Sequence, residues 1–270
     1  MLGCGLGLRP AYYDDLLANR YNIDFLEIIS EDFMVEGGAA LQTLDRLCQL
    51  YPIIMHGVSL SIGSVDPLNI DHLMRLKKLE QRVKPALISD HFCWTGVGNI
   101  NTHDLLPMPF TFEAVEHIVS RIHYVQEYLQ RELVLENISS YIGSENPELC
   151  EWDFINEIVS RSGCKILLDI NNIYINAYNY NFDAKKYIDA ISANDVVQYH
   201  LAGHKHCGTH IIDTHDAEII DPVWDLFNYA VEKIGPRVSI IERDDELPEL
   251  IVLLNEMENA RNIMEATKCL

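Results

Sequence analysis

The segment from Gln198 to Asp216, QYHLAGHKHCGTHIIDTHD, concentrates side chains that can bind a metal ion. Five of the chain's 11 histidines fall within it. Neutral imidazole is the commonest side-chain metal ligand, and Asp213 stands two residues from His215, so an extended backbone directs both side chains the same way. The segment therefore predicts a metal site. A polar loop with a few core or capping histidines is the alternative.

Further residues of ligand type stand where short apolar segments end. They are His56, Asp90, His91, Glu136, Asn137, Asp169, Asn171, Asn172, His200 and Glu242. Histidines and carboxylates brought together in one buried ring need compensating positive charge, which two or three divalent ions would supply. Each residue alone has an ordinary interpretation as a hydrogen-bonded polar group. A fold that gathers them would favour a multinuclear metal site.

Eight apolar segments predict β-strands, and a segment of helical periodicity follows each. The predicted strands are 1–8, 23–29, 53–58, 87–92, 133–138, 165–170, 196–201 and 238–241. The predicted helices are 11–20, 39–50, 70–83, 112–130, 149–162, 184–192, 222–233 and 247–266. Residues 93–109 and the histidine-rich segment are expected to be long loops, and Gly163 is expected to cap a helix.

Eight strand–helix units at roughly 30-residue spacing are typical of an α/β fold, a single (β/α)8 TIM barrel, here spanning residues 1–270. In such a barrel the carboxyl ends of the strands meet on one face, so the strand-end residues would converge. An open, doubly wound sheet is the alternative. It would be expected to carry a dinucleotide-binding fingerprint, and the glycines Gly3, Gly5 and Gly7 lack that spacing.

The composition of the chain argues against several kinds of partner and location. The chain has 41 acidic and 20 basic residues, a net charge of −21, and no basic cluster, so we expect no nucleic acid ligand. No apolar stretch approaches the roughly 18 residues of a membrane-spanning helix. The absence of an export signal predicts a cytoplasmic protein. Seven scattered cysteines without a CxxC pair predict reduced thiols and no disulfides.

Several phrases, in order along nearly the whole chain, resemble a known family. They are GLGLR, HGVSLSIG, SDHFCW, VLENISSY, LLDINNIYINAYN, YHLAGH, DTHD and IIERD. They are similar to the multinuclear non-haem iron oxidative enzymes, a bacterial family that includes the catalytic subunit of methanobactin synthesis and relatives that modify peptide cysteines. The wider resemblance is to the xylose isomerase-like barrels, of which endonuclease IV is a zinc example.

The resemblance implies a ligand set for two or three metal ions. Glu136 would bridge two ions, one completed by His56 and His91. The second ion would be completed by Asp169, His200 and Glu242. Asp213 and His215 would hold a third. Asn172 stands where the zinc nuclease has an imidazole, which implies a weaker third site.

Two further residues receive expected roles near this ligand set. His204 would orient the substrate or a proton, or support the site from behind. Asp90 would fix the tautomer of His56 or His91. His206 and His210 are interpreted as solvated loop residues.

The resemblance also implies the activity. Iron, rather than zinc or manganese, would bind a cysteine thiolate of a ribosomally made precursor peptide, and O2 would serve to oxidise that cysteine. A small partner protein would present the peptide. The alternatives are a zinc or manganese phosphodiesterase, a sugar isomerase on the same barrel, and a non-catalytic metal-binding protein.

Overall fold

The computed structural model describes residues 3–98, 100–143 and 146–267, and eight parallel strands within them close into a barrel. The strands are β1 (Cys4–Gly7), β2 (Phe25–Ile29), β3 (Ile53–His56), β4 (Ile88–His91), β7 (Val134–Glu136), β8 (Lys165–Asp169), β9 (Val196–Leu201) and β12 (Val238–Ile241). Each of these strands lies beside the next in chain order, and β12 pairs with β1 to close the ring. The predicted (β/α)8 barrel is confirmed.

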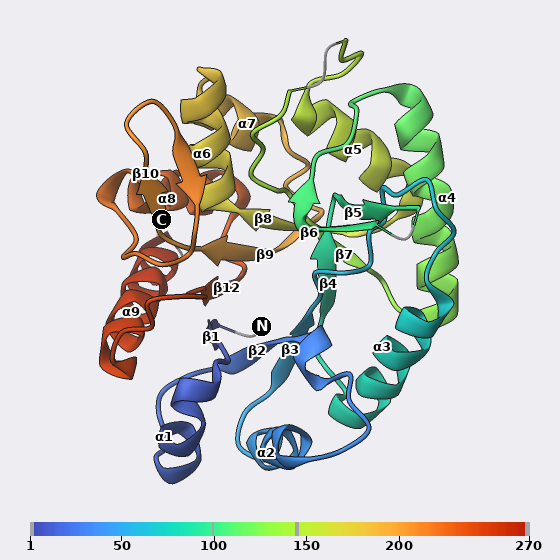
Figure 1. Cartoon of the computed structure of the whole chain (residues 1–270). Coiled ribbons are helices and arrows are strands. Elements are labelled where there is room, and N and C mark those ends of the chain that lie inside the picture. Colours follow the sequence, from blue (N-terminus) through green and yellow to red (C-terminus); the bar gives the residue numbers. More distant parts are fainter. Residues whose placement is uncertain (1–2, 99, 144–145, 268–270) are drawn as a thin grey trace.

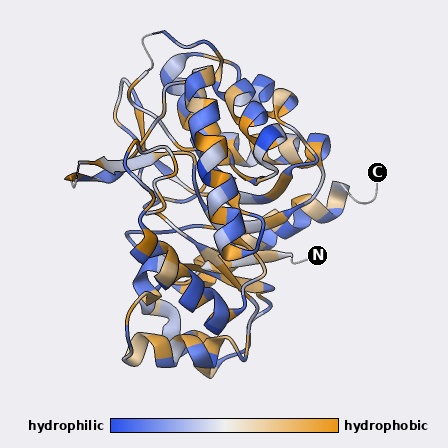
Figure 2. Cartoon of the chain, turned by 90° about the vertical axis from the view of Figure 1, so that its right-hand side faces the viewer, coloured by the Kyte–Doolittle hydropathy of each residue, from blue (hydrophilic) through white to orange (hydrophobic). Residues whose placement is uncertain are grey.

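Helices surround the strands (Figure 1). They are α1 (Tyr13–Ala18), α2 (Ala39–Leu47), α3 (Ile70–Val83), α4 (Phe112–Leu129), α5 (Glu151–Ser162), α6 (Ile170–Tyr180), α7 (Ala184–Ala190), α8 (Asp221–Ile234) and α9 (Leu250–Thr267), with the 3-10 helices η1 (Pro10–Tyr12) and η2 (Ser30–Phe33). Hydrophobic and hydrophilic residues alternate around the outer helices (Figure 2). The apolar side of each helix packs on the outward-facing residues of the strands, which builds the main hydrophobic core.

Local signals explain several helix ends. The side chains of Asn69 and Thr111 accept the backbone N–H groups of His72 and Ala114, which satisfies donors in the first turns of α3 and α4. Gly163 ends α5 with a φ of 72°, a left-handed conformation that glycine adopts without strain. The predicted cap at Gly163 is therefore confirmed.

Strand residues alternate between the helix side and the barrel interior, and this alternation positions the site. Phe25, Ile54, Val238 and Ile240 form a small buried cluster that is separate from the main core. Two residues beyond Phe25, Ile54 and Ile240 stand Glu27, His56 and Glu242, of which Glu242 directly follows β12. Because successive inward-facing positions are two residues apart, these polar side chains lie one layer above an apolar floor.

The structure also contains elements that the sequence did not predict. Residues 170–180 form α6, which begins directly after β8, although the sequence predicted only one helix after that strand, at 184–192. The expected loop 93–109 contains a hairpin of β5 (Trp94–Val97) and β6 (Ile100–Leu106). The histidine-rich segment contains a second hairpin, β10 (His204–His206) with β11 (Ile211–Asp213). Residues 1 and 2 of the first predicted strand lie outside the described residues.

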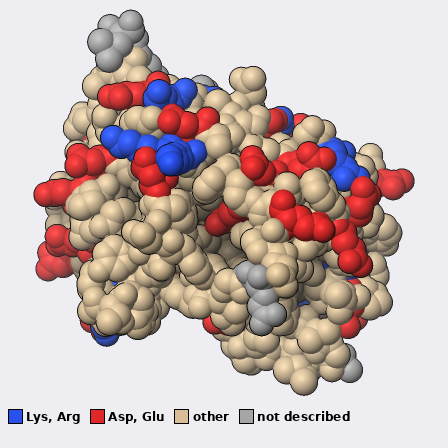
Figure 3. Space-filling view, turned by 90° about the horizontal axis from the view of Figure 1, so that it is seen from above, with Lys and Arg blue, Asp and Glu red and all other residues tan. Residues whose placement is uncertain are grey.

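The surface agrees with the acidic composition. Acidic side chains outnumber basic ones on the face seen in Figure 3, and the basic ones gather in a few places. Among the described residues, no helix is long and apolar enough to cross a membrane. The six cysteines in the described ranges are unpaired, and Cys269 lies outside those ranges.

Candidate metal centre

The carboxylate of Glu136 stands at the centre of the gathered strand-end residues. Its Oε2 lies 3.4 Å from Nε2 of His56, 3.4 Å from Nε2 of His91 and 3.5 Å from Nδ1 of His200. The ligand atoms of Glu136, His56 and His91 all lie within 4.8 Å of one another, and so do those of Glu136, Asp169 and His200. Glu136 therefore belongs to two groups, each of which offers three ligand atoms to one ion.

A third group adjoins the second. Ligand atoms of Asp169, His215 and Glu242 also lie within 4.8 Å of one another. Glu242 Oε2 is 3.1 Å from Nδ1 of His200 and 3.5 Å from Nδ1 of His215, so this carboxylate borders both groups. The predicted ligands of the first two ions thus occupy one continuous cluster.

Asp213 and His215 complete the outer edge of the cluster. Nε2 of His215 lies 2.8 Å from Oδ1 of Asp213. The same Oδ1 accepts a hydrogen bond from the Asn171 amide at 2.9 Å, and the Asp213 backbone N–H donates to the Tyr141 hydroxyl at 2.7 Å. Ser139 donates to the second oxygen of Asp213 at 3.4 Å. These contacts fix the carboxylate beside His215.

The start of α6 brings Asp169 and Asn172 into the site together. Asp169 is the last residue of β8 and the N-cap of α6, and its Oδ1 accepts the Asn172 backbone N–H at 2.6 Å. The Asn172 side-chain NH2 donates to the Asn137 carbonyl at 3.0 Å, which leaves the amide oxygen free to face the cluster. A capping bond therefore fixes two candidate ligands at once.

In each candidate histidine ligand, one ring nitrogen contacts a polar group outside the ligand set. The four histidines are His56, His91, His200 and His215. The Nδ1 atoms of His56 and His91 contact the Ser89 hydroxyl at 2.8 Å and the Gly57 carbonyl at 3.1 Å. The remaining two histidines contact carboxylates. Nε2 of His200 lies 3.0 Å from Glu27, and Nδ1 of His215 lies 3.2 Å from Asp244. In metal sites such outer contacts fix the tautomer and the ring orientation of a ligating histidine.

The cluster leaves buried polar atoms without hydrogen-bond partners, and these atoms are the ones that would face a metal. Within the described part of the chain they include Glu136 Oε2, Asp169 Oδ2, Asn172 Oδ1, His200 Nδ1 and His215 Nε2. Buried polar groups normally find partners, because an unpaired one costs about 1–3 kcal/mol. The short contacts among these atoms lack hydrogen-bond alignment, as expected of groups that point at shared ions. The residues therefore fit a multinuclear centre of nitrogen and oxygen ligands.

Burial and neighbouring charges shift the pKa values of the carboxylic acids in the cluster. Burial raises the pKa of Glu136 to about 7. Burial, together with the charge of Glu136, raises the pKa of Asp169 well above its usual range. Burial would also raise the pKa of Glu242, but the positive charges of His200 and His215 outweigh it and hold that pKa well below normal. Divalent cations would relieve the cost of burying these carboxylates together.

The pKa values of the histidines in the cluster shift in opposite directions. Burial, reinforced by His91 and His200, lowers the pKa of His56. For His91 burial is outweighed by the charges of Glu136 and Asp90, which raise its pKa to about 9. Neighbouring carboxylates likewise overcome burial and raise the pKa values of His200 and His215. Two buried rings thus favour opposite protonation states a few ångströms apart.

Asp90 and His204 lie behind the cluster. Asp90 accepts the backbone N–H groups of His91 at 2.7 Å and Leu60 at 3.0 Å. Its carboxylate is 3.9 Å from Nδ1 of His91, too far for a hydrogen bond. The partners that hold the tautomers of His56 and His91 are thus Ser89 and Gly57, where the sequence had suggested Asp90.

The contacts of His204 connect it to Asp213. Its Nδ1 contacts the Asn171 side-chain oxygen at 2.7 Å, and Asn171 in turn donates to Asp213. The His204 ring stacks on Tyr174 with 5.3 Å between centroids. His206 and His210 are both exposed, as predicted, but only His210 lies in a loop, because His206 is the last residue of β10.

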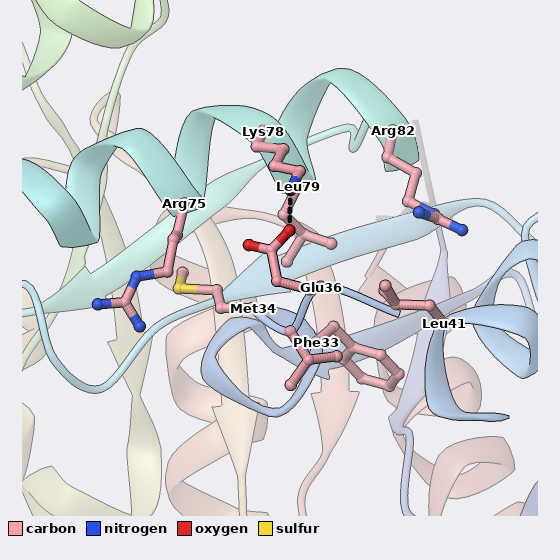
Figure 4. Close-up of a pocket in the computed structure, with 9 residues that line it drawn as sticks. Phe33, Met34, Glu36, Leu41, Arg75, Lys78, Leu79 and Arg82 are labelled. Carbon is pink, nitrogen blue, oxygen red and sulfur yellow. Dashed lines mark hydrogen bonds and ion pairs between the residues drawn. The ribbon is translucent and has the colours of Figure 1, made fainter. Parts of the chain in front are cut away.

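A cavity of about 250 Å³ opens onto the cluster. Seven of the nine predicted metal ligands line it: His56, His91, Glu136, Asn172, Asp213, His215 and Glu242. Asp169 and His200 are fully buried. A separate hollow of about 100 Å³ lies between α2 and α3, where Lys78 and Glu36 form an ion pair beside Phe33 (Figure 4). None of the predicted site residues lines that second hollow.

Sequence reasoning missed three charged residues at the site. Glu27 is buried in the middle of β2 and contacts His200. Arg9, just beyond β1, forms an ion pair with Asp244 and lies 3.6 Å from Glu242. A lone carboxylate on the inward side of an apolar strand was the available signal for Glu27. The link between Arg9 and Asp244 joins residues too far apart in sequence to be inferred without the fold.

The chain is similar to known protein sequences over almost its whole length. The sequence profile of a family described as "RiPP precursor modification enzyme MbnB/TglH/ChrH" matches residues 3–265. A UPF0276 protein of Caulobacter vibrioides (strain NA1000 / CB15N) is 47% identical over 260 residues, covering 96% of this chain and 93% of that protein. The barrel is also similar to solved structures. A D-tagatose 3-epimerase-like protein matches with a TM-score of 0.64 and 12% identity, covering 98% of each chain.

Endonuclease IV from Thermus thermophilus matches with a TM-score of 0.62 and 13% identity, covering 96% of this chain and 99% of the other. At such low identity these two structures show the (β/α)8 barrel fold and nothing about activity.

Proposed function

Because the chain belongs to the family of RiPP precursor modification enzymes MbnB/TglH/ChrH, we propose that it oxidatively modifies cysteine residues of a ribosomally synthesised precursor peptide. The proposed cofactor is two or three iron ions held by the cluster around Glu136. The observation that carries the proposal is the set of unpaired buried atoms on Glu136, Asp169, His200 and His215, which point at shared positions. Iron bound there would supply the one-electron chemistry with O2 that amino-acid side chains lack.

The ligand set divides among the proposed ions. Glu136 would serve two ions, with His56 and His91 completing one. Asp169, His200 and Glu242 would complete the other. Asp213, His215 and the amide oxygen of Asn172 would hold a third, weaker ion. The oxygen and nitrogen donors suit iron, and also manganese or zinc, so the choice of iron rests on the family and not on ligand type.

The protein's own residues would shape the space for the peptide. Glu136, with a pKa raised to about 7 by burial, can be ionised when positive charge is bound beside it. Tyr141 and Ser139 line the cavity and hold Asp213 in place, and Asp104 of the β5–β6 hairpin lines the same cavity. The volume of about 250 Å³ is sufficient for a cysteine side chain and part of its backbone. These walls would restrict water around the reacting side chain.

We further propose that a small partner protein presents the precursor peptide. The described elements are those of a barrel with two short hairpins, so peptide recognition is assigned to a second protein. Coexpression of the chain with a cysteine-containing precursor, with and without the partner, tests this assignment. Modification that is equally complete without the partner would contradict it.

Purification without oxygen, followed by metal analysis and exposure to O2 with the peptide, tests the proposal as a whole. We expect iron, O2 consumption, and a change in peptide mass that disappears when the peptide cysteines are replaced by serine. Full occupancy by zinc, together with undiminished activity under nitrogen, would contradict an oxidative role and favour the hydrolase or isomerase chemistry that other proteins perform on this barrel.

A further inference from the structure

The buried carboxylate of Glu27 contacts Nε2 of His200, whereas the carboxylates of Glu136 and Glu242 lie near Nδ1 of the same ring. Oε1 of Glu27 is 3.0 Å from Nε2 of His200, and its Oε2 accepts a hydrogen bond from the Gln198 amide at 2.5 Å. Glu27, His200 and Gln198 are at most 2% exposed. We propose that Glu27 is a positioning residue that keeps the His200 proton on Nε2 and so makes Nδ1 the metal-binding atom. This inference rests on the metal centre proposed above.

The proton assignment follows from donor chemistry. Nε2 of His200 has two polar neighbours, Glu27 Oε1 at 3.0 Å and the Gln198 side-chain nitrogen at 3.1 Å, and that nitrogen also donates to Glu27 Oε2. With an ion on Nδ1 the neutral ring keeps its proton on Nε2, and of these two neighbours only the carboxylate can accept it. The neutral ring then carries its lone pair on Nδ1. That atom has no hydrogen-bond partner among the described residues, and it lies 3.1 Å from Glu242 and 3.5 Å from Glu136. Glu27 therefore directs the free lone pair toward the two carboxylates that would share its ion.

The contacts of Glu27 also distinguish a positioning residue from a ligand. Atoms of Glu27, His56 and His200 come within 4.8 Å of one another, so Glu27 could be taken for a ligand. Both of its oxygens, however, are already engaged, one by His200 and one by Gln198. Glu136 Oε2 and Asp169 Oδ2, in contrast, have no hydrogen-bond partner, and Glu136 Oε2 lies 3.5 Å from Nδ1 of His200.

The partner of His200 differs from those of His56 and His91. Those two rings contact a hydroxyl group and a backbone carbonyl, both uncharged. A carboxylate on the far nitrogen makes an imidazole a more basic ligand than an uncharged partner does. Glu27 should therefore strengthen binding of the ion at Asp169, His200 and Glu242, and should leave the ion at His56 and His91 little changed.

Titration with Co²⁺ alone under nitrogen, on the full chain, tests the role of Glu27. Glu27→Gln should weaken binding of one Co²⁺ by about 10–100-fold, as loss of an outer carboxylate typically does. Glu27→Leu should weaken it further, because it leaves the Nε2 proton buried without an acceptor. Glu151→Gln removes a half-buried carboxylate, whose hydrogen-bond partners Tyr187 and Asn176 lie outside the cluster, and should leave Co²⁺ binding unchanged.

A double-mutant cycle separates positioning from the other roles. If Glu27 acts only through His200, adding Glu27→Gln to His200→Ala should change Co²⁺ affinity by no more than about twofold. If the two single substitutions each weaken Co²⁺ binding and their effects add in the double variant, the proposal is overturned. Additive effects would mean that Glu27 acts on Co²⁺ binding without His200, as a ligand or a purely structural residue would. His200→Gln provides a second background if the alanine variant does not fold by circular dichroism. A wild-type protein that binds at most one Co²⁺ would instead contradict the proposed centre itself.

Discussion

Asp169 caps the helix on which Asn172 stands, through a hydrogen bond of 2.6 Å from the Asn172 backbone N–H to Asp169 Oδ1. The bond uses one carboxylate oxygen and leaves Oδ2 of Asp169 without a hydrogen-bond partner, and the amide oxygen of Asn172 has none either among the described residues. A strand that ends in a capping aspartate thus delivers two ligand-type oxygens to the site from four consecutive residues. One of them, the neutral amide, is the weaker ligand.

Because the neutral amide of Asn172 is a weak ligand, we predict that the proposed third ion, at Asp213 and His215, is the first to be lost. Mild chelation should remove one metal without unfolding the barrel, because Asp213 and His215 would share the proposed third ion with the weak ligand Asn172. Asn172→His should raise its affinity by about 10–100-fold and shift its occupancy toward zinc, which favours imidazole. Metal counts and circular dichroism before and after chelation, on both proteins, measure the effect. Simultaneous loss of all ions, or an Asn172→His variant that binds no more metal than the parent, would argue against this position.

Replacement of Glu136 should have the largest effect on metal content. Glu136→Gln keeps the shape of the side chain but removes the charge that would bridge two ions, so we expect the loss of about two ions per chain and of activity. His210→Ala serves as the control, since His210 is exposed on the loop between β10 and β11. Elemental analysis of both variants after anaerobic purification decides the point. Retention of both ions by Glu136→Gln would contradict bridging.

Glu151, outside the cluster, predicts a dependence of stability on pH. Burial raises the pKa of Glu151 from 4.5 to about 7, although hydrogen bonds from Tyr187 and Asn176 partly oppose the shift. The folded state therefore binds this proton more tightly than the unfolded state, so its contribution is complete below about pH 4.5 and is lost as pH rises through 7. Glu151→Gln should not show this loss. Its free energy of unfolding relative to wild type should therefore rise by about 1–3 kcal/mol from pH 5 to pH 8.

Urea unfolding of wild type and Glu151→Gln at the two ends of this pH range measures the difference. Glu127→Gln, on an exposed position of α4, is the matched control and should follow the wild-type curve. Equal pH dependence in wild type and Glu151→Gln would mean that the Glu151 carboxyl is not protonated preferentially in the folded state.

The strand-end residues could be predicted from sequence because the carboxyl ends of all strands in a barrel meet on one face. Apolar segments that end in His56, Glu136 or Glu242 reveal both the strand and the face on which the side chain emerges. Glu27 does not follow this pattern, because it lies two residues before the end of β2 and reaches across the barrel interior. Only the closed ring of strands brings it to His200.

The unpredicted elements have local explanations. Helix α6 contains four asparagines, which are poor helix formers, and its stability depends on the Asp169 cap and on apolar contacts at Ile170 and Ile173. The β5–β6 hairpin is largely exposed, so it lacks the buried alternation that identifies a strand in a sequence. Asp244 and Arg9 meet only where the ring closes between β12 and β1.

The proposed function requires that this chain hold several redox-active irons that act on a peptide cysteine. The most direct measurement is the iron content of protein purified without oxygen, with Mössbauer spectra recorded before and after addition of the cysteine-containing peptide. We predict more than one iron per chain and a spectrum that changes with the cysteine peptide but not with its serine counterpart. One metal or fewer per chain, zinc throughout, or spectra that do not respond to the cysteine peptide would contradict the proposed function.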